Sequence, residues 1–131
     1  MIYLNLLVNP VPASRPRVTR WGVYYGKNHA ACRTELCSLL DSLRGGFTLP
    51  PILCGKLSVW VLLSVKKPKT TKLESPRGDV DNYIKLLFDC MNTRIWKDDA
   101  QVDIISARKE WGDYGCFDVW ISERNTNERK E

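Results

Sequence analysis

The sequence has only one histidine, His29, and its five cysteines form no C-x-x-C pair. A structural zinc site needs clustered cysteine and histidine ligands, and a disulfide-stabilised fold needs paired cysteines. The sequence therefore excludes both a structural zinc site and a disulfide-stabilised fold. No apolar run approaches the ~20 residues that span a bilayer, and the N-terminus lacks the pattern of a secretion signal. We therefore expect a reduced, cytoplasmic protein with no membrane partner. His29 stands at the start of a predicted helix and is expected at the surface or as a cap.

Composition indicates an ordinary globular chain with a modest excess of positive charge. The 131 residues fit one domain, with 44% apolar and 27% charged residues. Twenty Lys and Arg against fifteen Asp and Glu give a net charge of +5. Such an excess favours an acidic partner, most commonly nucleic acid, although it can also serve solubility alone.

The pattern of apolar residues predicts four main strands and two helices. Helical spacing runs through residues 28–43 and 80–91, and strand character marks residues 2–8, 56–65, 102–111 and 114–122. The order predicts an α/β (α+β) fold: a two-layer β-α-β-α-β-β mixed sheet with its helices packed on one face. Residues 56–65 are too apolar for an edge strand and are expected at the centre.

Turn signals predict how these elements connect. Gly112-Asp113 is expected to join the last two strands into a hairpin, and residues 21–26 to form a short hairpin that turns at Gly22. In that short hairpin, Trp21 can stack on splayed DNA bases, but we predict that it packs against a neighbouring strand or a dimer partner. Residues 1–122 are expected to form one domain, and residues 123–131 a flexible tail.

Acidic residues are concentrated around the second predicted helix. Asp79 and Asp81 stand at its start, Lys85 lies one turn later on the same face as Asp81, and Asp98-Asp99 precede the next strand. Converging carboxylates suit Mg²⁺, which prefers hard oxygen ligands and can generate a hydroxide nucleophile for phosphodiester hydrolysis. The nearby ammonium of Lys85 can stabilise charge that develops in that reaction.

Each of these residues also has a purely structural interpretation. Asp79 is a plausible helix N-cap, Asp81 with Lys85 is a routine surface pair, and Asp98-Asp99 can form a turn. Their density within one segment of a basic chain favours the catalytic interpretation.

The segment GDVDNYIKLLFD…WKDDAQV resembles the core of the RusA family, Mg²⁺-dependent endonucleases that resolve four-way (Holliday) DNA junctions. The resemblance is close over residues 76–102 and extends loosely to Pro10–Arg17, where Ala13-Ser14 replace a lysine that many members carry. It implies metal binding by Asp79, Asp81 and Asp99, with Mn²⁺ a plausible substitute for Mg²⁺ and Lys85 assisting catalysis. It also implies a homodimer acting on branched DNA, without an organic cofactor, in a bacterial or phage-infected cell.

Two basic groups are expected to contact DNA, and the second leads straight into the acidic segment, so phosphates drawn to it would be delivered there. Their members are Arg15, Arg17, Arg20 and Lys27 in the first group, and Lys66, Lys67, Lys69, Lys72 and Arg77 in the second. Two alternatives stay open: a metal-dependent nuclease for flaps or forks, and a DNA-binding module without catalysis.

Overall fold

A computed structural model of the protein describes residues 1–14, 17–24, 26–46 and 49–124. Its strands are β1 (Ile2–Leu6), β2 (Arg17–Thr19), β3 (Gly22–Tyr24), β4 (Lys56–Lys66), β5 (Val102–Gly112) and β6 (Cys116–Arg124). Its helices are α1 (Lys27–Gly45), α2 (Val80–Met91) and the short 3-10 turn η1 (Asp99–Gln101).

Four strands form the main sheet in the order β1-β6-β4-β5. β4 pairs in parallel with β5 and antiparallel with β6, and β1 is antiparallel to β6. The predicted mixed sheet is confirmed, and so is the central place of β4. Two neighbours satisfy the backbone groups along both edges of this strand, which suits a segment whose side chains are largely apolar.

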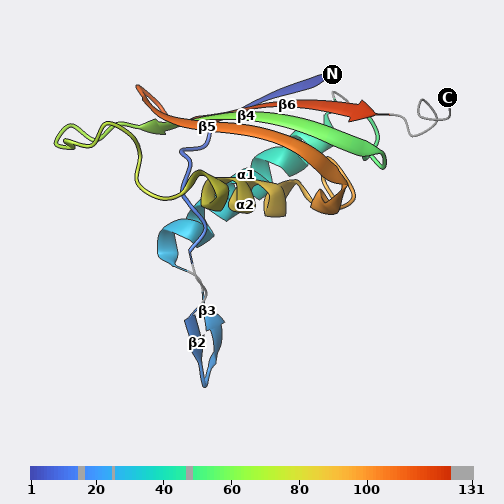
Figure 1. The fold of residues 1–131 in the computed structure, drawn as a ribbon. Coiled ribbons are helices and arrows are strands. Elements are labelled where there is room, and N and C mark those ends of the chain that lie inside the picture. The colour runs from blue at the N-terminus through green and yellow to red at the C-terminus, as the bar shows by residue number, and fades with distance from the viewer. Residues whose placement is uncertain (15–16, 25, 47–48, 125–131) are drawn as a thin grey trace.

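Both long helices lie on one face of this sheet, as predicted (Figure 1). Alternate residues of β4, among them Val59 and Leu63, contribute to the buried core. The predicted apolar stripe of α2 is buried from Tyr83 to Met91, and only Val80 at its start is half-buried. Packing of this stripe fixes which side of α2 faces outward, and that outward side carries Asp81 and Lys85.

The predicted hairpin of the last two strands is wrong. β5 and β6 follow one another with a short connection, but β4 lies between them and pairs with both. Gly112 pairs with Lys66 and Cys116 pairs with Ser64, so the connection passes over the end of β4. Pairing β5 directly with β6 would leave the most apolar strand with an unpaired edge, which is costly.

Several local predictions also need correction. The short hairpin exists as β2 and β3, but it turns at Arg20-Trp21, so Gly22 begins the second strand instead. Trp21 is 75% exposed, so the prediction that it packs on a neighbouring strand is wrong within this chain. His29 is buried, contrary to the expected surface position. β6 continues to Arg124, past the predicted domain end, while residues 125–131 of the predicted tail lie outside the described residues.

Within the described ranges, no helix is long and apolar enough to cross a membrane. The cysteines described there are free thiols, as expected from their scattered positions. Cys32, Cys90 and Cys116 are buried and act as core residues.

Candidate active site

The first carboxylates stand at the exposed start of α2. Asp79 occupies the N-cap position with extended backbone angles, but its side chain makes no capping hydrogen bond. Asp81 lies in the first turn, and neither carboxylate has a hydrogen-bond or ion-pair partner in the described part of the chain. Lys85 is exposed one turn later and is not paired with Asp81 among the described ion pairs. The capping and surface-pair interpretations are therefore not realised here, which leaves both carboxylates available to a ligand.

Lys109, which the sequence interpretation did not select, holds the chain just before Asp79. Its ammonium donates hydrogen bonds to the carbonyl oxygens of Pro76 at 2.7 Å and Gly78 at 2.5 Å. Gly78 has a φ of +90°, a conformation that favours glycine. These bonds fix the approach of the chain into α2. The sequence shows only a lysine within the predicted strand 102–111, and its half-buried position next to this loop is seen only in the structure.

The N-terminal loop lies against the same end of α2. The amide of Ala13 donates to the carbonyl of Asn82 at 2.9 Å. A Cβ atom added at Gly78 would lie 3.1 Å from the Cγ of Pro12, so the two segments are closely packed. The loop that precedes the first basic group therefore runs beside Asp79 and Asp81. Arg15 and the side chain of Arg17 lie outside the described residues, whereas Arg20 is exposed.

The structure separates the roles of the two adjacent aspartates. Asp98 is the N-cap of η1: its carboxylate accepts from the amide of Ala100 at 3.0 Å, and Gln101 completes a capping box. Asp99 is half-buried, and its Oδ2 accepts from Nδ2 of Asn92 at 3.4 Å. Asp98 thus has a structural role as a helix cap, whereas the carboxylate of Asp99 can still bind a ligand.

Asn92 links Asp99 to the core. Its Oδ1 accepts from the indole Nε1 of Trp96 at 2.7 Å, and Trp96 is fully buried. The Trp96 ring also packs edge-on against Phe88, with centroids 5.0 Å apart. A rigid aromatic anchor therefore orients the amide that meets Asp99.

Asp99 does not join Asp79 and Asp81 within one chain. Asp79 occupies the position just before the first turn of α2, whereas Asn92, the partner of Asp99, occupies the position just after its last turn. The 12 residues between these positions span ~18 Å at the rise of an α-helix. Figure 1 shows the loop into α2 and the turn that follows α2 at opposite ends of this helix. Accordingly, the described residues contain no group of three or more His, Cys, Asp or Glu side chains that could hold a metal ion.

The second basic group begins at the last residue of β4, Lys66, and continues on the loop between β4 and α2. Its members Lys66, Lys67, Lys69, Lys72 and Arg77 are all exposed. Trp111 of β5 holds this loop through a 2.9 Å hydrogen bond from its Nε1 to the carbonyl of Leu73. The loop leads directly into Asp79, so its positive charge adjoins the first two carboxylates.

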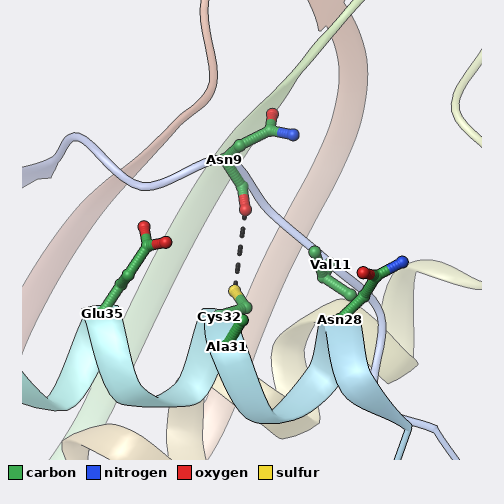
Figure 2. Close-up of a pocket in the computed structure, with 6 residues that line it drawn as sticks. All are labelled: Asn9, Val11, Asn28, Ala31, Cys32 and Glu35. Carbon is green, nitrogen blue, oxygen red and sulfur yellow. Dashed lines mark hydrogen bonds between the residues drawn. The ribbon is translucent and has the colours of Figure 1, made fainter.

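One described cavity is lined by Ala100 and Gln101, next to Asp99, and the other three are lined by residues far from the acidic segments in the sequence. One of about 340 Å³ lies between α1 and the segment after β1, where the Cys32 thiol donates to the carbonyl of Asn9 at 3.6 Å (Figure 2). Burial raises the pKa of Cys32 to about 11, so this thiol stays protonated at neutral pH and is a poor nucleophile. Asp79, Asp81 and Asp99 line none of the four described cavities. An open acidic surface suits a large polymer better than a small enclosed molecule.

Comparison with known protein families gives a match over most of the chain. A family model described as Endodeoxyribonuclease RusA matches residues 8–121, which include the N-terminal loop, α2 and both acidic segments. No curated protein matches the chain.

Proposed function

The chain belongs to the RusA family of endodeoxyribonucleases, and from that premise we propose a Mg²⁺-dependent enzyme that resolves four-way DNA junctions by paired symmetric nicks. The observation that carries the proposal is the pair of exposed carboxylates at the start of α2, which have no partner among the described residues and are adjoined by a basic loop. Phosphates attracted by the loop would approach the carboxylates directly. The expected setting is DNA recombination and repair in a bacterial or phage-infected cell.

The metal ligands in this proposal are Asp79, Asp81 and Asp99. Their hard carboxylate oxygens fit Mg²⁺, and Mn²⁺ is a plausible substitute. A bound divalent cation supplies a hydroxide nucleophile and neutralises charge on the phosphate. Lys85, one turn from Asp81 on the exposed side of α2, would stabilise the additional negative charge of the transition state.

A homodimer resolves the separation between these aspartates. Two ligands of one Mg²⁺ lie at most ~4 Å apart, because each Mg–O bond is ~2.1 Å, so ligands at opposite ends of α2 cannot share an ion. A two-fold dimer can bring Asp99 of one protomer to Asp79 and Asp81 of the other, and the symmetry produces two such sites. Two sites match the two nicks that junction resolution requires.

The test is cleavage of a labelled four-way junction with Mg²⁺ and with EDTA, beside linear duplex and flap DNA. Metal-dependent, symmetric nicks confined to the junction are expected. Equal cutting of all three substrates would favour a less selective nuclease, and preferential cutting of flaps or forks would favour the other branched substrates. Binding without cutting in either Mg²⁺ or Mn²⁺ would favour a non-catalytic DNA-binding module.

The metal assignment has a separate test. Asp81→Asn is expected to abolish cutting while junction binding persists, because the amide removes an anionic ligand without adding negative charge. Asp113→Asn is the matched control, an exposed aspartate in the connection between β5 and β6. Cleavage at the wild-type rate by Asp81→Asn would refute the assignment of Asp81 as a ligand.

A further inference from the structure

The hairpin of β2 and β3, residues 17–24, forms a finger that projects from the body on the side of the helices (Figure 1). Its strands pair from Arg17 with Tyr24 to Thr19 with Gly22, which places Arg20 and Trp21 at the tip. The turn is ordered by Thr19, whose Oγ1 accepts from the amide of Trp21 at 3.2 Å and donates to the carbonyl of Gly22 at 3.3 Å. The tip is therefore a hydrogen-bonded turn that exposes a large aromatic side chain.

The surface of this finger is apolar and cationic. Trp21 is 75% exposed and Val18 is 81% exposed. The guanidinium carbon of Arg20 lies 4.9 Å from the centroid of the Trp21 ring, within the range of a cation–π contact. The finger contains two arginines and no acidic residue. An exposed indole beside a cation suits a nucleobase next to its phosphate.

The root of the finger is anchored beside the candidate active site. Ser14 and Gly26 flank the finger and are joined by a 3.0 Å hydrogen bond from the Gly26 amide to the Ser14 hydroxyl. The amide of Ser14 also donates to Nδ1 of the buried His29 at 2.9 Å. The neighbouring residue, Ala13, bonds to the first turn of α2, which carries Asp81. Trp21 follows Ser14 by seven positions, which an extended chain can span over at most ~25 Å, so the tip stays within that distance of its root.

We propose that the finger is a branch-point probe, in which the Trp21 ring stacks on an unpaired or unstacked base at the centre of a DNA junction. This inference rests on the proposed function and adds the element that distinguishes a junction from a continuous duplex. Bases in a continuous duplex are stacked on each other and offer no face to an indole, whereas bases at a branch point are more easily unstacked. Arg20 holds the adjoining phosphate.

The experiment measures the dissociation constants for a four-way junction and for a linear duplex of equal length, in EDTA so that no DNA is cut. Trp21→Ala is expected to weaken junction binding by about 5- to 150-fold, the range for loss of one base–aromatic stack. Binding to the duplex should stay unchanged, and Trp21→Phe should recover most of the junction affinity. Tyr114→Ala is the matched control, because Tyr114 is another exposed aromatic residue, 62% accessible, in a different turn.

The dissociation constants of the wild-type protein for the two DNAs separate failure of the finger hypothesis from failure of the proposed function. If it binds both DNAs equally, the proposed junction selectivity fails. If it prefers the junction and Trp21→Ala keeps that preference, only the finger hypothesis fails. Equal loss for junction and duplex would also overturn the finger hypothesis. Conversion of a wild-type dimer to a monomer by Trp21→Ala, measured by sedimentation, would instead identify the finger as a contact between protomers.

A photo-crosslinking phenylalanine at position 21 gives the contact directly. Crosslinks are expected at the nucleotides that flank the branch point. Crosslinks confined to the duplex arms or to a second protein chain would refute the probe. The same reactive residue at position 114 is the control for non-specific capture.

Discussion

Subunit mixing tests whether the active site is shared between two protomers. The perturbation combines an Asp81→Asn protomer with an Asp99→Asn protomer in one dimer, purified with two different affinity tags. If each site is shared between protomers, one of the two sites contains both substitutions and loses both carboxylates. The other site is intact, because it takes Asp81 from the Asp99→Asn protomer and Asp99 from the Asp81→Asn protomer. If each chain formed its own site, both sites would carry one substitution and neither would cut.

The expected magnitude follows from the separation of the aspartates. The ~18 Å length of α2 greatly exceeds the ~4 Å between two ligands of one magnesium ion. Each mixed dimer should therefore contain one working site of two, giving about half of the wild-type site concentration. The assay is nicking of a supercoiled plasmid with an extruded cruciform. One working site should nick the plasmid, whereas two sites acting together should linearise it.

A reciprocal mixed dimer makes the result unambiguous. It pairs a wild-type protomer with one that carries both Asp81→Asn and Asp99→Asn. A shared site predicts no cutting by this dimer, because each site then contains one substitution. A site formed within one chain predicts one working site instead. Activity in the reciprocal dimer together with inactivity in the first would refute the shared site.

Three other predictions follow from single contacts. Lys109→Met should lower the free energy of unfolding by about 1–3 kcal/mol and slow cleavage, since it removes both hydrogen bonds that fix the chain before Asp79. The control is Arg108→Met at a neighbouring exposed position, which should leave the melting temperature and the single-turnover rate unchanged. The pKa of His29 is lowered by burial and by Arg33, so the contribution of His29 to stability is full above pH 6.5 and is lost as pH falls toward the lowered pKa. The difference in free energy of unfolding between wild type and His29→Gln, measured by urea denaturation, should therefore shrink between pH 7 and 5, and a constant difference would contradict this. The third change neutralises three loop lysines, Lys67, Lys69 and Lys72. It should weaken junction binding and reduce the slope of log K against log salt concentration by ~0.9 for each lost phosphate contact. An unchanged slope would place the loop outside the DNA interface.

Local sequence patterns determined the elements and the candidate residues. The helical spacing of apolar residues located α2 between the two acidic segments, and the apolar content of residues 56–65 placed β4 at the centre of the sheet. Both signals are local because they depend on which side chains alternate or recur along one element. The same locality explains the wrong hairpin: a short connection favours pairing of adjacent strands, but β4, which lies much earlier in the chain, pairs with both of them.

Only the tertiary structure decided how these residues are arranged in space. The sequence places Asp98 and Asp99 side by side, but the turn geometry makes Asp98 a cap and turns Asp99 toward Asn92. It places both acidic segments around α2, but the length of this helix separates them within one chain. The exposure of Trp21 likewise depends on what the rest of the fold leaves uncovered. Contacts between distant segments set these features, and no spacing along the chain encodes them directly.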